Sequence, residues 1–167
     1  MQNVRDPGDP RRLDESFRSF YRAFEMFNRI AWGNRLPRCL IRFYRRRNSR
    51  TLASACDGLP GKISFNISNC LRLPESFLWG VLAHEMTHIW QYAMGRPGGH
   101  GADFQAEMLR IGVDEKYGVV IPGTAGDYIF TLNEISPVNL YDALRTIAGQ
   151  SSLRTPEFAE QFIKNNH

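Results

Sequence analysis

The pattern His84-Glu85-Met86-Thr87-His88 constrains this chain more than any other feature of its sequence. It lies in a segment that is apolar almost throughout, that opens with Pro74 at a first helical position and that meets Gly95 as a stop. A helix that is apolar on nearly all sides is buried against other elements, so we expect it to face a sheet. The two histidines, four residues apart, then project from one face of this helix.

Two histidines one helical turn apart can both reach a single metal ion. Glu85 lies about 100° round the helix from His84, where it reaches a water on the metal without being a ligand. This is the arrangement of a zinc hydrolase with Glu85 as the general base. The alternative is a pair of buried histidines without metal, and each of these polar groups would then need a protein partner. We therefore predict one zinc per chain, bound by His84 and His88.

A catalytic zinc takes three protein ligands and leaves one position for water, so a third ligand must come from elsewhere. His100 lies in a glycine-flanked loop, where free backbone torsions let an imidazole turn back onto the preceding helix. Glu107 is the alternative in a thermolysin-like arrangement, because it follows His88 by 19 residues. Asp103 also lies near, although its position is typical of a helix N-cap. We expect His100 as the ligand, and the two acids stay as alternatives.

The remaining patterns predict an α+β fold. Apolar residues from Leu13 to Ala31 recur at spacings of three and four, which indicates a helix that ends at Gly33. Alternating apolar residues predict strands over 39–44 and 63–68, and a further strand within 51–56, hence a small antiparallel sheet packed on the histidine helix. We expect three later helices, over 103–112, 138–148 and 157–164. The stretch between the first and second of these, which contains Tyr117 and Tyr128, is expected to be irregular.

A chain of 167 residues is long enough for one domain with one core. We expect a flexible lead-in over 1–12 and a single domain over 13–167. The longest apolar run, Phe77–Ala83, is too short for a membrane span, and the charged N-terminus lacks the apolar stretch of a signal peptide. The three cysteines include no C-x-x-C pair, which favours a reducing compartment. We therefore expect a cytoplasmic monomer that is not membrane-bound, and that is nucleoid-associated or nuclear if its role is linked to DNA.

Charge is distributed unevenly along the chain. Residues 1–50 carry a net charge of +8 and the rest −4, within an overall charge of +4. The segment 35–50 holds seven arginines and no acid, with Phe43 and Tyr44 among them and Trp32 just before. This pattern favours phosphate contacts and base stacking. A solvated surface is the alternative. We predict a single-stranded or distorted DNA partner, contacted by Arg42, Arg45, Arg46, Arg47 and Arg50.

The stretches HEMTHIWQ and GHGADFQAEMLRIG resemble the SprT-like metallopeptidases, the family that includes the Spartan protease. That family has H-E-x-x-H on a helix, followed by a loop with H-G-x-x-F. The segments NRLPRCLIRFYRRRNSRTLASACDG and KISFNIS are also similar, so the resemblance covers about 24–112. It implies a zincin-like fold, His84, His88 and His100 as zinc ligands, Glu85 as the base, and proteolysis of proteins on or crosslinked to DNA, as in DNA repair. The cysteine zinc ribbon of many bacterial members is missing, and we identify no resemblance in the helical extension 113–167.

These observations predict a zinc-dependent endopeptidase that acts on DNA-associated proteins. One alternative is a zinc peptidase with no nucleic acid role, such as an effector or a processing protease. Another is a non-catalytic DNA-binding module whose zinc is structural and fully coordinated. An extended substrate would pair with an exposed sheet edge, for which we expect the strand 63–68. The residue that would donate a hydrogen bond to the oxyanion is a tyrosine or an arginine, and the sequence does not rank the four candidates, Tyr117, Tyr128, Tyr141 and Arg96.

Overall fold

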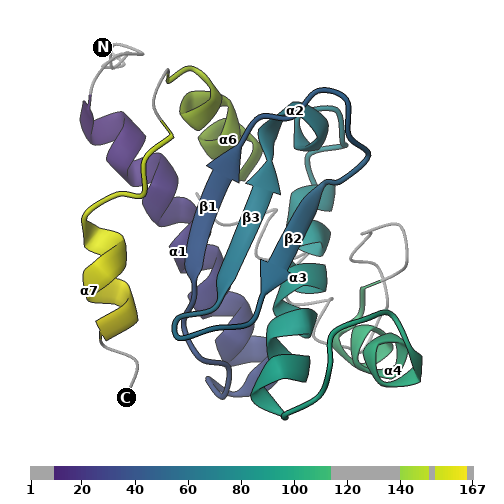
Figure 1. Cartoon of the computed structure of the whole chain (residues 1–167). Helices are drawn as coiled ribbons and strands as arrows, with labels where there is room; N and C mark the ends of the chain where they lie inside the picture. The colour runs from purple at the N-terminus through teal and green to yellow at the C-terminus, as the bar shows by residue number, and fades with distance from the viewer. Residues whose placement is uncertain (1–9, 114–139, 151–152, 165–167) are drawn as a thin grey trace.

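The computed structural model describes residues 10–113, 140–150 and 153–164. These ranges contain six helices and three strands, which confirms the predicted α+β class (Figure 1). The predicted irregular segment 113–137, with Tyr117 and Tyr128, lies almost entirely outside the described residues. In chain order the elements are α1 Pro10–Trp32, β1 Leu40–Tyr44, β2 Ala53–Cys56, β3 Lys62–Asn66, α2 Ile67–Cys70, α3 Phe77–Ala93, α4 Ala102–Ile111, α6 Leu140–Ala148 and α7 Phe158–Lys164.

The sheet is mixed, and the prediction of an antiparallel sheet is wrong. Its strand order is β1-β3-β2, with β1 parallel and β2 antiparallel to β3. Alternation in the sequence predicts a strand but says nothing about its partner. The connection 45–52 leaves the position beside β1 open and leads to β2, which lies one strand further from β1. Strand β3 then occupies the position between β1 and β2. The strand expected to be an edge, 63–68, is therefore central, and β2 is an edge strand.

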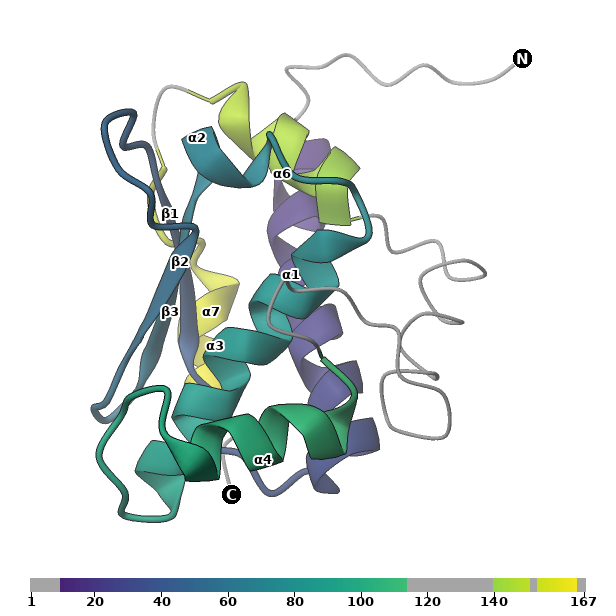
Figure 2. The same cartoon turned by 90° about the vertical axis from the view of Figure 1, so that its right-hand side faces the viewer.

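Helices α1 and α3 cover the same face of the sheet (Figure 2). Phe20 of α1 lies 4.9 Å from the ring of Phe43 on β1 and 5.3 Å from that of Phe65 on β3. All three rings are buried, and aromatic pairs at such distances contribute beyond their buried area. Helix α6 packs along α1. Helix α7 also packs on α1, where Phe158 and Phe162 contact the ring of Tyr21. The apolar face of α1, predicted from the spacing of residues from Leu13 onward, therefore forms the part of the core that faces the sheet.

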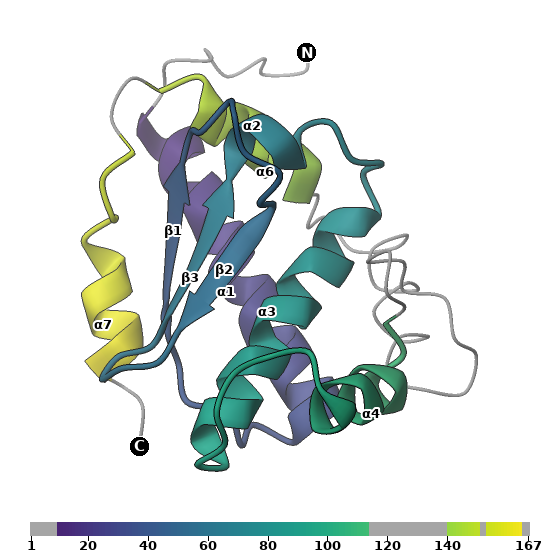
Figure 3. The ribbon, with the colours of Figure 1, turned by 45° about the vertical axis from the view of Figure 1, so that its right-hand side comes forward.

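Helix α3 is buried along most of its length, as its apolar sequence predicts. It packs on β2, and the segment between α3 and α4 turns back along it toward the sheet (Figure 3). Residues 74–76, predicted as its first turn, form a separate turn in which the Phe77 N–H donates to the Pro74 carbonyl at 2.9 Å. Within the described ranges, no helix combines the length and the hydrophobicity that a membrane span requires.

The two sheet edges differ in what covers them. On β1, the Tyr21 hydroxyl accepts a hydrogen bond from the Ile41 N–H at 3.0 Å and donates to the Ile41 carbonyl at 3.3 Å. Burial raises the pKa of Tyr21 to about 12, so the hydroxyl keeps its proton. This contact satisfies backbone groups that an edge strand otherwise leaves open. On β2, the edge away from β3 carries no further strand in the described part of the chain.

The strand predicted over 63–68 ends at Asn66, and the next residues form the short helix α2. Asn66 is fully buried and holds the connection 45–52 in place. Its Oδ1 accepts from the Arg46 N–H at 3.0 Å, and its Nδ2 donates to the carbonyls of Arg46 and Thr51 at 3.0 Å. This side chain therefore stabilises the crossover that makes the sheet mixed.

Candidate metal centre

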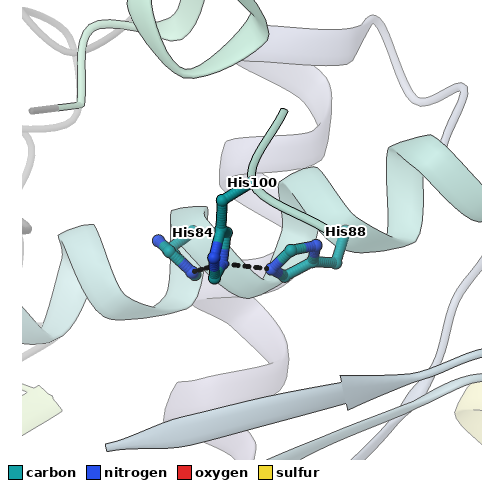
Figure 4. Close-up of side chains that lie close together, drawn as sticks. All are labelled: His84, His88 and His100. Carbon is teal, nitrogen blue, oxygen red and sulfur yellow. Dashed lines mark hydrogen bonds between the residues drawn. The ribbon is translucent and has the colours of Figure 1, made fainter. Parts of the chain in front are cut away.

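The structure brings together the three histidines that the sequence predicts as zinc ligands. His84 and His88 project from one face of α3, and His100 reaches them from the loop before α4 (Figure 4). The His100 Nε2 lies 3.2 Å from the Nε2 atoms of both His84 and His88. One ligand atom from each of the three residues lies within 4.8 Å of the others. The rings therefore converge on one point rather than on separate partners.

The spacing of these nitrogens fits one tetrahedral metal ion. Zinc binds histidine nitrogen at about 2.0 to 2.1 Å, so two nitrogens at tetrahedral positions on one ion lie about 3.3 Å apart. The observed separations of 3.2 Å are close to this value. Without a cation, the single proton on the His100 Nε2 could satisfy only one of its two neighbours. The donor set and its geometry therefore suit zinc.

The electrostatics of the site favour neutral imidazoles, which are the form that binds a metal. Burial, followed by repulsion from His88 and His100, lowers the pKa of His84 to about 4. Burial also lowers the pKa of His88, against a hydrogen bond to Gln91 that raises it. At neutral pH both rings on α3 therefore offer a lone pair without first losing a proton.

Phe104 of α4 forms a common surface beneath the three imidazoles. Its ring stacks on His88 at 4.5 Å, and it meets the rings of His84 and His100 edge-on, both at 4.8 Å. Phe104 is buried, so its position is set by the packing of α4 against α3. The phenylalanine four residues after His100 in the sequence motif thus fixes the orientation of all three rings.

Glu85 lies beside the cluster and is buried, with an exposed fraction of 4%. Burial alone raises the pKa of its carboxyl from 4.5 to about 8. Among the described residues, no group donates a hydrogen bond to it, which agrees with that cause. A carboxyl with a pKa near neutrality can both accept and return a proton, as a general base requires.

A cleft of about 300 Å³ opens between β2 and α3 at the cluster. One wall is the edge of β2 with the residues just before it, and the other carries the histidines and Glu85. Arg50 belongs to the first wall, and Tyr92 lines the second. Tyr92 was not among the residues predicted to act at the site, because its place on the histidine face of α3 has no motif to mark it. Of the four predicted oxyanion donors, Tyr141 instead donates to the Leu71 carbonyl at 3.3 Å and Arg96 pairs with Asp103 at 3.7 Å.

The two acidic alternatives to His100 have other partners. Glu107 is buried and forms an ion pair with Arg110, which also donates to the Ala31 carbonyl at 2.9 Å. Asp103 was predicted to be an N-cap, and this is wrong, because α4 begins at Ala102 with Gly101 as its N-cap. The Asp103 carboxylate instead accepts a hydrogen bond from the Gln91 amide at 3.2 Å, which lowers its pKa.

The five arginines predicted to contact DNA do not form one uniform group. Arg45 donates to the carbonyls of Ala148 and Gln150 at 2.5 and 2.7 Å, so it anchors the end of α6. All five residues are exposed, but within the described residues the side chains of the other four have no hydrogen-bond or ion-pair partner. One of these four borders the cleft at the histidines. The free guanidinium groups belong to Arg42, Arg46, Arg47 and Arg50.

Comparison with known proteins gives one match. The model of the SprT-like family matches residues 20–122, which is more than half of the chain and includes the three histidines and Glu85. No curated protein and no solved structure matched the chain. The matched region runs from α1 through α4, so it contains every element that builds the cluster. The fold, the converging histidines and this match together establish that the chain belongs to the SprT-like family.

Proposed function

We infer that this chain is a zinc-dependent endopeptidase with a zincin-like active site and one zinc per chain. The observation that carries this proposal is the convergence of three imidazole nitrogens beside a buried carboxyl with a raised pKa. His84, His88 and His100 would hold the ion. When bound, zinc would polarise the scissile carbonyl and lower the pKa of a water toward about 7.

The protein's own groups supply the remaining steps. The Glu85 carboxylate takes a proton from the attacking water and returns it to the leaving amine. The substrate lies as an extended strand along the open edge of β2, where backbone N–H and C=O groups bind it without sequence preference. The edge of β1 is a poor alternative, because Tyr21 already binds its backbone. This replaces the expectation that the strand 63–68 is the edge.

Metal analysis combined with a peptidase assay tests this function. Wild type should contain one zinc per chain and hydrolyse a denatured protein substrate, and a strong chelator should abolish the hydrolysis. Glu85→Gln should keep the zinc and lose the hydrolysis, because it removes the base and no ligand. Glu107→Gln is the matched control, a buried glutamate on the next helix. Zinc binding with no hydrolysis of any substrate would favour a structural metal instead.

We also propose that the substrates are proteins associated with DNA, which single-stranded or distorted DNA brings to the enzyme. The support is the set of exposed arginines around the connection 45–52, one of which, Arg50, borders the active-site cleft. An extended polyanion bound along this segment would hold an attached protein near the β2 edge. A peptidase without any nucleic acid role is the competing function.

A charge reversal that spares Arg45 tests the DNA contact, since Arg45 holds α6. The double variant Arg46→Glu/Arg47→Glu should weaken binding of a single-stranded oligonucleotide regardless of its sequence, and the slope of log K against log salt should fall by about 0.7 to 0.9 for each lost contact. Arg22→Glu/Arg29→Glu changes the charge equally on exposed positions of α1 and is the control. An equal loss in both variants, or no DNA affinity of wild type at low salt, would remove DNA from the proposed function.

A further inference from the structure

Gln91 is a buried amide on α3, three residues after His88, with an exposed fraction of 1%. Its Oε1 lies 2.7 Å from the His88 Nδ1. Its Nε2 donates to the Gly99 carbonyl at 3.1 Å and to the Asp103 carboxylate at 3.2 Å. One side chain thus contacts a histidine of the cluster, the residue before His100 and the first turn of α4. Neither the family match nor the H-E-x-x-H motif assigns it a role.

Chemistry decides the orientation of this amide. The Gly99 carbonyl and the Asp103 carboxylate are both acceptors, so the donating NH₂ end of Gln91 must face them. The carbonyl end then faces His88 and can only accept, which places the proton of that imidazole on Nδ1. The Nε2 of His88 is left with its lone pair directed at His84 and His100. Gln91 therefore selects the tautomer that can bind a metal.

The same amide holds the loop that carries His100. Gly99, whose carbonyl accepts the hydrogen bond from the Gln91 Nε2, has a φ of +132°, a conformation that residues with a side chain rarely take. The Gln91 backbone carbonyl also accepts from the Arg96 N–H at 2.9 Å. Gln91 therefore bonds the loop at both its beginning and its end. The loop is further confined at Gly98, where an added Cβ would lie 2.7 Å from the Tyr92 hydroxyl oxygen.

We propose that Gln91 is a positioning residue that couples the two parts of the metal centre: it sets the tautomer of His88 on α3 and docks the loop that supplies His100. The inference rests on the proposed function, because it assumes that the three histidines bind zinc. Hydrogen-bonded partners of metal-binding histidines commonly change metal affinity by 10- to 100-fold. Here a single side chain makes these contacts for two ligands from different elements.

Zinc affinity of the chelator-treated full chain, measured by competition with a chromophoric chelator, tests this role. Gln91→Leu should bind zinc about 10- to 100-fold more weakly than wild type, with faster release. Thr87→Val is the control, because the Thr87 hydroxyl is equally buried on α3 but bonds only the Ala83 carbonyl and the Met108 sulfur. It should change zinc affinity less than about twofold. A Gln91→Leu affinity within twofold of wild type, or equal to that of Thr87→Val, would overturn the inference.

A double-mutant cycle separates the two ends of the amide. In a His100→Ala background the loop has no ligand to deliver, so Gln91→Leu should cost several-fold less zinc affinity than it does in wild type. An undiminished cost there would mean that the loop contact has no role. Asp103→Ala removes one loop contact at a partly exposed position and serves if Gln91→Leu does not fold. It should weaken zinc binding about 3- to 10-fold, and an unchanged affinity would count against the coupling. If wild type itself binds no zinc, the proposed function fails, which is a different outcome from equal binding by wild type and variant.

Discussion

Replacing Glu85 by Gln should make the metal-free protein more stable while it abolishes activity. The carboxyl is buried, accepts no hydrogen bond from the described residues and has its pKa raised from 4.5 to about 8. Between these two values the folded protein holds a proton that the unfolded chain has released. The stability that this proton represents is present in full below pH 4.5 and is lost as the pH rises through 8. Glutamine does not titrate, so the Glu85→Gln variant keeps this stability at high pH.

The size of the effect follows from the same two pKa values. At about 1.4 kcal/mol for each pH unit, the interval from 4.5 to about 8 sets an upper value of about 5 kcal/mol. Water in the cleft lowers the cost of a charged carboxylate, so we expect Glu85→Gln to gain about 1 to 3 kcal/mol at pH 8 or above. The gain should grow from pH 5 to pH 8 and then stay constant. The lowered pKa of His84 acts equally in both proteins and cancels in the difference.

Urea unfolding of chelator-treated wild type and variant at several pH values between 5 and 9 measures this difference. Glu107→Gln is the control for loss of a buried carboxylate, and it should destabilise the protein because it breaks an ion pair with Arg110. A Glu85→Gln variant that is no more stable than wild type at pH 8, or whose advantage does not change with pH, would refute the reasoning about the buried carboxyl.

Three further outcomes are expected. Zinc at about 1,000 times its dissociation constant should raise the unfolding free energy of wild type by about 4 kcal/mol; in thermal unfolding at the same zinc concentration, His100→Ala should lose most of this shift and Glu107→Ala should keep it. Asn66→Ala should cost about 2 to 4 kcal/mol in urea unfolding, because it leaves buried backbone groups of the connection 45–52 without partners; a cost below 1 kcal/mol would contradict its role in the crossover. Phe20→Ala should cost about 3 to 5 kcal/mol by calorimetry or denaturant, since its ring fills the space between α1 and the sheet, and a loss as small as that of a surface substitution would contradict that packing.

Most helices were predictable because each carries its own periodicity, but the short helix α2, which begins inside the predicted strand 63–68, was not. The apolar spacing from Leu13 predicts α1, although the helix already begins at Pro10, and the stop at Gly112 ends α4 in a left-handed conformation with a φ of +84°. The ends of elements were less predictable. The strand predicted over 63–68 gives way to α2 after Asn66, the residue whose side chain binds the connection 45–52.

Contacts between distant segments could not be predicted in the same way. No local pattern distinguishes Arg45, whose side chain binds carbonyls at the end of α6, from the neighbouring Arg46 and Arg47, whose side chains have no partner among the described residues. Gln91 could not be predicted as a site residue from the sequence either, since its role depends on contacts with Gly99 and Asp103 that form only in the folded chain. The partners of Arg45 lie more than 100 residues away, and those of Gln91 lie in the loop and helix that follow α3; in both cases only packing brings them to the side chain.

The sequence by itself determined the α+β class, the helix that carries His84, Glu85 and His88, and the glycine-flanked His100, because helical spacing and backbone freedom are local properties. The tertiary structure alone decided that β3 lies at the centre of a mixed sheet and that β2 presents its open edge to the cleft. It also decided that the three imidazoles meet over Phe104. Strand order, burial and ring orientation depend on which surfaces pack together, and a one-dimensional pattern does not contain that information.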